Sequence, residues 1–485
     1  MTSYSLSLER PTLLVLVALC ALIGAATAIA PLAGAIVPMT VVAFLLLSRM
    51  DRPVLFLFIA FLILQDPCLF FVGGDASPAG FVIKRLDEAF LYSIAFWVLI
   101  SSRLARQALS VPRLGFLVAG CFGGMIASTL IVGVRWIPVL TDLTLFSKPF
   151  LLFAIGTSIR ADASDVRKDL RIAVPCMMFV VAFAAVFLVA PSWQEAYLGA
   201  LRTPDERIGM LSAQGFFDGP GPYSWFCAAT FAVTYAAYLA FGRTVYLASA
   251  ITAAMFAILS WRRKSIGGIV IMVIVAAAIQ LGRDPATRRR GLLVLAIAAL
   301  VALTILAPVI TALWQYTLHE YSGDPGSLAR VALHYTSLAI ARDYFPFGTG
   351  LASFGSYASA VYYSDVYTSY GLSTVWGLTP SYSAYITDTF WPMVLGQGGV
   401  ISFVPYVLIF VLLVRTFWSA ARLPNTSKED RFIALCALFL VLGSLLESTS
   451  SHIYDTSMQS ALVMIPAGAA WSRFTVVVKH SIPAL

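Results

Sequence analysis

Long apolar segments recur along almost the whole chain, and each is about as long as a bilayer is thick. Runs of roughly 17–25 mostly apolar residues have the length of a membrane-crossing helix, and about fourteen such runs meet this criterion. They begin near Pro11, Pro31, Val54, Asp87, Leu114, Val139, Ile172, Tyr223, Thr244, Ser265, Leu292, Trp391, Phe432 and Thr456. Of the 485 residues, 60% are hydrophobic and only 12% are charged, which excludes a soluble protein. We therefore predict an all-α polytopic integral membrane protein.

The distribution of basic residues predicts the orientation of these spans. With a cytoplasmic N-terminus and alternating spans, most of the 32 lysines and arginines fall on the cytoplasmic side, as the positive-inside rule requires. They include Arg167, Arg171, Arg243, Arg415 and Lys428, and the C-terminus lies on the same side. The same bias explains the net charge of +8 without any nucleic-acid partner. The run from about Pro11 to Ala30 is read as a first span, although small residues near its end leave a cleaved signal peptide open.

One long segment, Gln315 to Trp391, breaks the alternation of apolar spans and short turns. It is too polar, and too rich in Gly, Ser and Tyr, to cross a bilayer, and loops this long are usually functional. The orientation above places it outside the membrane, together with a smaller loop at residues 191–222. We expect one membrane domain over residues 1–485, with residues 315–391 as an outer insertion. Within the insertion, Arg330 to Ile340 has helical spacing and Pro346 to Gly350 reads as a turn.

Glycines in that turn suggest a close approach of the backbone. Gly348 and Gly350 are separated by a single residue, and glycine lets a backbone come close to a ligand or to another helix. The pattern does not decide between these two, and an ordinary end of a helix would also explain it.

Cysteine and histidine are too scattered to form a metal centre or a disulfide framework. The six cysteines and four histidines stand singly along the chain, without the short spacings that metal ligands or paired thiols show. We read the cysteines as small buried apolar side chains. No metal or cofactor is expected.

Arg262, Arg263 and Lys264 are consecutive between two apolar spans, on the side where few basic residues fall. At the bilayer centre each would cost about 2.5–3.5 kcal/mol, so they must lie at the interface or face an anion. Guanidinium and ammonium groups bind phosphate well, which suggests a diphosphate clamp that Arg207 and Arg330 could join. A miscounted span, or side chains that reach to lipid headgroups, would also explain the triplet.

Aromatic and acidic side chains near the same side complete the candidate site. Trp376, Tyr382 and Tyr385 suit sugar recognition, because flat amphipathic rings stack on sugar faces; an interfacial aromatic belt is the alternative. Asp388 and Glu447 stand at the edges of apolar spans and are candidates for a general base, or they are simply hydrated or paired with an arginine. Lys148 within a span is a further candidate, unless it pairs with Asp142 or a carbonyl group.

Four sequence elements, in this order, resemble the bacterial O-antigen polymerase and O-antigen ligase superfamily of the Wzy/WaaL type. The first is Lys84-Arg85-Leu86-Asp87-Glu88, similar to an acidic pair at an early span of polymerases. The second, Ser260-Trp261-Arg262-Arg263-Lys264-Ser265, resembles a basic element between two helices. The third is Arg330 followed by Phe345-Pro346-Phe347-Gly348-Thr349-Gly350, at the start of the large loop. The fourth is Asp388-Thr389-Phe390-Trp391 with Leu395-Gly396-Gln397-Gly398-Gly399-Val400, at its end.

The resemblance implies a metal-independent glycosyltransferase with a GT-C-like fold in the bacterial inner membrane, its large loop in the periplasm. Its partners would be an undecaprenyl-diphosphate-linked oligosaccharide, membrane lipids and a chain-length regulator protein. Arg262, Arg263 and Arg330 would hold the lipid diphosphate. Ligases of this superfamily have a histidine near the end of the large loop, but Tyr382 to Asp388 contains none. We therefore favour an O-antigen or exopolysaccharide polymerase, with a ligase as the nearest alternative and a polysaccharide or lipid transporter as an alternative of another class.

Overall fold

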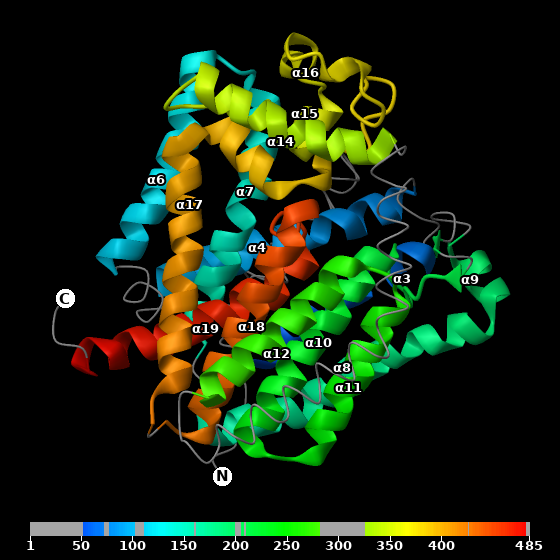
Figure 1. Cartoon of the computed structure of the whole chain (residues 1–485), viewed down its shortest axis with the longest axis vertical. Coiled ribbons are helices and arrows are strands. Elements are labelled where there is room, and N and C mark those ends of the chain that lie inside the picture. The colour runs from blue at the N-terminus through cyan, green and yellow to red at the C-terminus, as the bar shows by residue number, and fades with distance from the viewer. Residues whose placement is uncertain are drawn as a thin grey trace, which may run out of the picture. The chain divides into compact units, whose positions relative to one another are not determined.

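The computed structural model describes residues 52–71, 77–101, 111–159, 162–198, 205–207, 210–281, 325–424 and 426–481, which form two compact units, Met1–Ser101 and Ser102–Leu485. In the first unit the helices are α3 (Arg52–Phe71) and α4 (Pro78–Ser101). The second unit has α6 (Pro112–Val132), α7 (Trp136–Thr157), α8 (Ala163–Val189), α9 (Pro191–Leu198), β1 (Glu206–Arg207), β2 (Met210–Leu211), α10 (Pro220–Phe241), α11 (Thr244–Leu259) and α12 (Arg263–Leu281). It continues with α14 (Pro325–Asp343), α15 (Tyr357–Val361), α16 (Asp365–Ser369), η1 (Leu372–Thr374), η2 (Ile386–Asp388), α17 (Phe390–Arg422), α18 (Lys428–Glu447), η3 (Ser448–Ser450) and α19 (Ser457–Ser481) (Figure 1).

The described part of the chain is an all-α membrane protein apart from one short β-hairpin. Seven of its helices are long and apolar enough to cross a membrane: α6, α7, α8, α10, α12, α17 and α18. Shorter apolar helices lie at Leu55–Phe71 and Thr244–Leu259. The spans predicted near Pro11, Pro31 and Leu292 lie outside the described residues, so the count of about fourteen stays a prediction.

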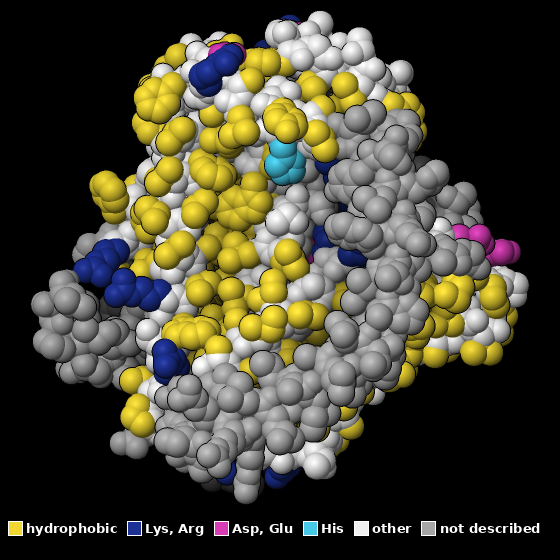
Figure 2. Space-filling model, viewed as in Figure 1, with side chains coloured by type: hydrophobic (Ala, Val, Ile, Leu, Met, Phe, Trp, Pro, Cys, Tyr) yellow, Lys and Arg dark blue, Asp and Glu magenta, His cyan; other side chains and the backbone are white. Residues whose placement is uncertain are grey.

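The surface of the described helices is apolar where lipid would contact it. Leu130, Ile131, Ile251 and Ile274 are each at least half exposed, and Figure 2 shows hydrophobic side chains over much of the described surface on one face. Such large exposed apolar areas are unfavourable in water and favourable against acyl chains. The membrane assignment therefore rests on the surface as well as on helix length.

In the first unit, α3 and α4 pack against each other, and α4 corrects one expected boundary. The sequence predicted a span that begins near Asp87, but the helix already begins at Pro78. Lys84, Arg85 and Asp87 therefore lie within a helix. The physical reason is that a helix extends beyond its apolar part where charged side chains can pair along it, as Arg85 does with Glu88 at 3.2 Å.

In the second unit, three groups of helices pack along their lengths. α6 lies along α17, α7 lies along α19, and α10 contacts α11, α12 and α18. The core of the last group is tightly filled by Trp225, Phe226 and Phe439, which are almost fully buried. These contacts bring the ends of α11, α12 and α18 to one place, which becomes important for the candidate site.

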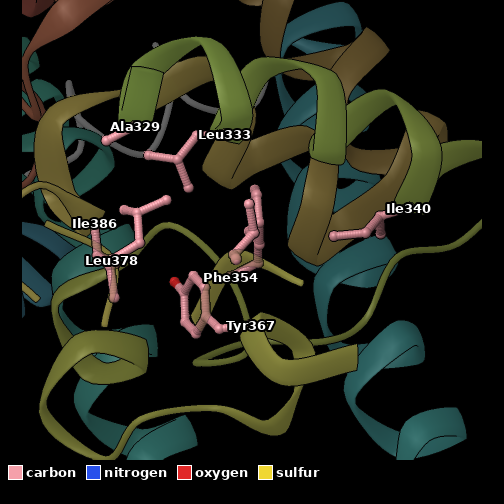
Figure 3. Close-up of a cluster of buried hydrophobic side chains, with 8 residues drawn as sticks. Ala329, Leu333, Ile340, Phe354, Tyr367, Leu378 and Ile386 are labelled. Carbon is pink, nitrogen blue, oxygen red and sulfur yellow. The ribbon is translucent and has the colours of Figure 1, made fainter. Parts of the chain in front are cut away.

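The described part of the long polar segment, residues 315–391, is folded around a small core of its own. α14 follows the predicted helical spacing and ends before the predicted turn. Its inner face packs over the short helices α15 and α16 and the 3-10 helices η1 and η2. The core consists of Ala329, Leu333, Ile340, Phe354, Tyr367, Leu372, Leu378 and Ile386 (Figure 3). Tyr367 is fully buried, and its hydroxyl accepts a hydrogen bond from Gly355 N at 2.7 Å and contacts Ser359 Oγ at 2.8 Å.

The turn after α14 is joined to the membrane helices through backbone hydrogen bonds. Gly348 N donates to Ser128 Oγ of α6, and Thr349 N and Gly350 N donate to the carbonyl oxygens of Gly396 and Gln397 of α17, all within 2.9–3.1 Å. α17 is broken at this point by Gly399, whose φ is +63°. We call this contact between residues 346–352 and residues 396–401 the seam. Among the interpretations given for the Gly348–Gly350 turn, the structure shows the approach to another helix.

The seam needs glycine because there is no room for a side chain. A Cβ atom on Gly348 would lie 2.3 Å from Gly396 O, and one on Gly399 would lie 2.2 Å from the backbone of Phe347. Neither obstacle is a flexible side chain, so the two backbones would have to separate.

We expect Gly348→Ala to lower the unfolding temperature of the protein in detergent, with a destabilisation of about 1–3 kcal/mol as for other overpacked sites. Gly123→Ala is the control, because Gly123 is a helical residue of α6 with nothing within 4 Å of its Cβ position. The control should be neutral or stabilising, since alanine favours helix. Equal unfolding temperatures for Gly348→Ala and Gly123→Ala would contradict this account of the seam.

Candidate functional site

The basic triplet lies in the tight turn between α11 and α12. α11 ends at Leu259 and α12 begins at Arg263. Trp261 between them has a φ of +54° and is buried, a conformation that costs energy for a bulky residue. The turn thereby holds Arg262 against the hairpin of β1 and β2, where its Nη2 donates to Asp205 Oδ2 at 3.1 Å.

Asp205 binds several partners at once and fixes the hairpin to the turn. Its Oδ2 accepts hydrogen bonds from Ser212 Oγ at 2.9 Å and from Arg207 Nε at 3.3 Å, in addition to Arg262. The backbone adds a bond from Ala213 N to Leu259 O. One carboxylate thus holds two predicted cations side by side.

Lys264 is held by the end of α18. Its ammonium group lies 2.9 Å from Glu447 Oε1 and donates to Ser450 O at 2.9 Å. Ser265 Oγ donates to the other oxygen of Glu447 at 3.2 Å. The Glu447 side chain is only 2% exposed, with one oxygen bound to Lys264 and the other to Ser265. This arrangement positions Lys264 and leaves Glu447 little access to a substrate.

Arg330 of α14 pairs with Asp388 at the end of the long segment. Arg330 Nε and Nη2 donate to Asp388 Oδ2 at 3.0 and 2.7 Å. The Asp388 side chain is 25% exposed, and the described hydrogen bonds to it fall on one oxygen only. Asp388 is therefore the more accessible of the two carboxylates predicted as a base.

Arg262 interacts electrostatically with members of each of these ion pairs. Burial lowers the pKa of its guanidinium, the charges of Arg207 and Arg330 lower it further, and Asp205 and Glu447 oppose the change. The structure thus brings together Arg207, Arg262, Lys264, Arg330 and Glu447 from four separate segments, with Asp388 bound to Arg330. Arg263 lies beside them as the first residue of α12 and is half-buried.

One donor of this cluster is left unused. Arg262 Nε is buried and has no hydrogen-bond partner among the described residues. A buried donor without an acceptor is costly, so the site is suited to receive an anion at this place. We call the group of Arg207, Arg262, Lys264 and Arg330 the cation cluster.

The three aromatic side chains predicted for sugar binding also lie together. The ring centroids of Trp376 and Tyr382 are 5.1 Å apart, those of Trp376 and Tyr385 are 5.2 Å apart, and those of Tyr382 and Tyr385 are 6.0 Å apart. Trp376 and Tyr382 are 46% and 43% exposed. Asp388 N donates to Tyr385 O at 3.1 Å, which places the aromatic group one turn from Asp388.

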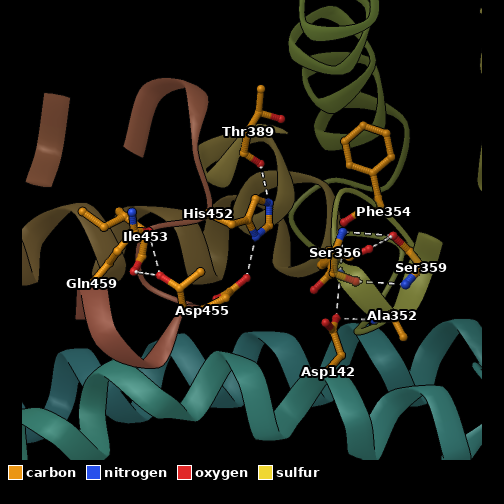
Figure 4. A network of polar contacts seen from close by, with 12 residues as sticks. Asp142, Ala352, Phe354, Ser356, Ser359, Thr389, His452, Ile453, Asp455 and Gln459 are labelled. Carbon is orange, nitrogen blue, oxygen red and sulfur yellow. Dashed lines mark hydrogen bonds and ion pairs between the residues drawn. The ribbon is translucent and has the colours of Figure 1, made fainter. Parts of the chain in front are cut away.

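The sequence did not single out His452, which the structure places at the end of the long segment. Its Nε2 lies 2.9 Å from Thr389 O and its Nδ1 lies 2.5 Å from Asp455 Oδ2 (Figure 4). Both ring nitrogens therefore face acceptors, which favours the imidazolium form. Burial lowers the pKa of His452, but the charge and hydrogen bond of Asp455 and the carbonyl of Thr389 outweigh burial, and the net pKa is raised. The only sequence signal was a histidine in a short polar run between two apolar spans.

A buried carboxylate within α7, that of Asp142, forms hydrogen bonds to the seam. Asp142 Oδ2 accepts from Ala352 N at 2.6 Å and from Gln397 Nε2 at 2.7 Å, and Figure 4 shows it beneath Ser356 and Ala352. Lys148 is buried further along the same helix. Asp142 thus contacts both sides of the seam.

Trp391 connects the start of α17 to the end of α18. Its Nε1 donates to Ser448 Oγ at 2.9 Å, so the start of α17 is fixed to the end of α18. Asp388 and Glu447 are far apart in the sequence. Glu447 directly precedes Ser448 of this hydrogen bond, and Asp388 directly precedes Thr389, which contacts His452. No group of three His, Cys, Asp or Glu side chains in the described ranges is placed to hold a metal ion.

Neither a comparison with protein-family models nor a comparison with curated protein sequences gives a match to this chain. The interpretation of the site therefore depends on its geometry.

We expect the stability of the fold to fall as the pH rises through the raised pKa of His452. A folded-state pKa above the ordinary value of about 6.5 means that protonation stabilises the fold fully below that value, and that this stabilisation is lost as the pH increases past the folded-state pKa. The unfolding temperature of the protein in detergent should therefore decrease from mildly acidic to mildly alkaline pH. Asp455→Asn removes the charge that favours the imidazolium, so its profile should be flatter.

His334→Gln is the control for this experiment, because His334 is an exposed histidine on the surface of α14. Its profile should have the slope of the wild type. Parallel profiles for the wild type and Asp455→Asn would show that the His452–Asp455 pair does not contribute as described.

Proposed function

We propose that the protein is a polysaccharide polymerase of the Wzy type, a GT-C-like glycosyltransferase that joins undecaprenyl-diphosphate-linked repeat units at the periplasmic face of the bacterial inner membrane. The observation that carries this proposal is the cation cluster. Four basic side chains from three separate parts of the chain meet next to three carboxylates, and one buried guanidinium donor lacks an acceptor among the described residues. A lipid diphosphate has the negative charge and the oxygen acceptors that this arrangement lacks. The termini would be cytoplasmic, with about fourteen spans in all.

The reaction would break one bond and form another at a sugar carbon. A hydroxyl group of an incoming lipid-linked unit attacks the anomeric carbon of the growing glycan, and the bond from that carbon to the diphosphate oxygen breaks. The polyprenyl diphosphate leaves with the bonding electron pair. Arg262, Lys264 and Arg330 stabilise its negative charge, as fixed charges do for other leaving groups.

Asp388 and Glu447, the two carboxylates predicted as a general base, would have different roles. Asp388 is partly exposed and has an oxygen free of described hydrogen bonds, so it is the better candidate to take the proton from the attacking hydroxyl. Glu447 is buried and holds Lys264, so it positions a cation. Both nitrogens of His452 are engaged, and its role is to fix the backbone beside Asp388.

The Trp376–Tyr382–Tyr385 group would bind the sugar next to the bond that changes. Two of its rings are exposed and all three are packed together, which makes a rigid amphipathic surface of the kind that stacks on a pyranose. Its chain connection to Asp388 would align the acceptor hydroxyl with that carboxylate.

Two variants should separate binding from proton transfer in an assay with the purified protein and a defined lipid-linked repeat unit. Arg262→Ala removes a stabilising donor and should lower the rate of elongation by roughly 100- to 1,000-fold, with weaker binding of the lipid diphosphate. Asp388→Asn should lower the rate by roughly 100-fold or more with little effect on that binding. The products, analysed by size, should be a ladder of longer glycans on the lipid carrier in the wild type.

Arg135→Gln is the matched control, because Arg135 is an exposed arginine between α6 and α7, near the seam. It should elongate at the wild-type rate. Normal elongation by both Arg262→Ala and Asp388→Asn would contradict the assignment. Transfer of glycan only to another acceptor would instead identify a ligase, and substrate movement without a new glycosidic bond would identify a transporter.

We also expect Trp376→Ala to raise the KM for the acceptor unit by roughly 5- to 30-fold, since loss of an aromatic stacking contact costs roughly 1–2 kcal/mol. Its kcat should change less, because the cation cluster and Asp388 remain in place. Tyr357→Ala serves as the control, as Tyr357 is equally exposed on α15 outside the aromatic group. Equal KM values for the two variants would argue against sugar binding at Trp376.

A further inference from the structure

A second basic site lies at the opposite ends of the helices that build the cation cluster. A cavity of about 310 Å³ is lined by Arg167, Leu170, Arg171, Phe241, Arg243, Tyr246 and Lys428. These residues come from the second and third turns of α8, the first turns of α11 and α18, the last residue of α10 and the α10–α11 turn. We call this cavity the basic pocket.

The pocket has an apolar floor and a cationic rim. Leu170 and Tyr246 are buried, whereas Arg167, Arg171, Arg243 and Lys428 are exposed. Arg167 is neutralised by Glu429, whose carboxylate lies 2.6 Å from the guanidinium. None of the ion pairs among the described residues involves Arg171, Arg243 or Lys428. The rim therefore has an excess of three positive charges at one opening.

The position of the pocket along the helices indicates what contacts it. α18 runs from Lys428 at the pocket to Glu447 at the cation cluster, 20 residues or about 30 Å of helix, which is the thickness of a hydrocarbon core. α11 likewise runs from the pocket to the turn that holds Arg262. The pocket thus lies at the second membrane surface, at the level of lipid headgroups.

We propose that the basic pocket binds the phosphate headgroup of an anionic membrane lipid. The three cations would hold the phosphate oxygens with charge-assisted hydrogen bonds, while Leu170, Phe241 and Tyr246 contact the glycerol and the first acyl carbons. Basic pockets between membrane helices are suited to such headgroups. This site is distinct from the cation cluster and does not depend on the proposed glycosyl transfer.

The test uses the full-length protein purified in a neutral detergent, with cardiolipin and phosphatidylcholine as lipid probes and inorganic diphosphate as the soluble probe. Native mass spectrometry measures bound lipid, and thermal unfolding measures the stabilisation each probe gives. The wild type should bind cardiolipin in preference to phosphatidylcholine, with a preference that weakens as salt increases. The triple variant Arg171→Gln/Arg243→Gln/Lys428→Gln should bind cardiolipin about tenfold more weakly or worse.

One control assigns the binding to the pocket. Lys168→Gln removes an exposed cation of α8 that does not line the cavity, and it should bind cardiolipin as the wild type does. A wild type without preference for cardiolipin, or a triple variant with unchanged binding, would overturn the proposal. If the triple variant lost binding of inorganic diphosphate but kept binding of cardiolipin, the ligand of the pocket would be a soluble phosphate compound. That result would overturn the lipid assignment.

A second measurement needs only the wild type and does not depend on the folding of the triple variant. A photoactivatable cardiolipin should cross-link to the peptide that contains Phe241 and Tyr246. Cross-links confined to other parts of the chain would contradict the proposal.

Discussion

The architecture of the candidate site depends on the seam between residues 346–352 and the broken helix α17. Two chain segments that are distant in sequence approach so closely that only glycine fits at Gly348 and Gly399. Asp142, buried in α7, accepts hydrogen bonds from both sides of this contact. The seam fixes the described part of the long polar segment to the membrane helices, and Arg330 and Asp388 on that segment are thereby set beside the turn that carries Arg262.

Opposing charges hold the cation cluster in place without neutralising it. Asp205 holds Arg207 and Arg262, Glu447 holds Lys264, and Asp388 holds Arg330. Buried or half-buried cations that lie this close repel one another, and each carboxylate offsets part of that repulsion. The buried Nε of Arg262 has no acceptor among the described residues, so an anion would complete the arrangement. This is the physical basis for the proposed binding of a lipid diphosphate.

Much of this site could be predicted from residue types, and the remainder could not, because it depends on tertiary contacts. The basic triplet was visible because consecutive cations between apolar spans are costly, and Trp376, Tyr382 and Tyr385 were visible as aromatic residues in a polar segment. The pairing of each cation with a particular carboxylate requires distances that the sequence does not contain. His452 was missed because a single histidine three residues before an aspartate is not a distinctive pattern, and its other partner, Thr389 O, is distant in the sequence. α4 was predicted to begin too late because hydropathy marks the apolar part of a helix and not its polar extension.

The most direct test of the central claim is to locate the phosphates of a bound lipid-linked substrate in a structure of the purified protein, determined by electron cryomicroscopy. The account predicts that the diphosphate lies within hydrogen-bond distance of Arg262, Lys264 and Arg330, with the first sugar between Asp388 and the aromatic group. A diphosphate bound elsewhere in the protein, with the cation cluster in contact only with its own carboxylates, would contradict it.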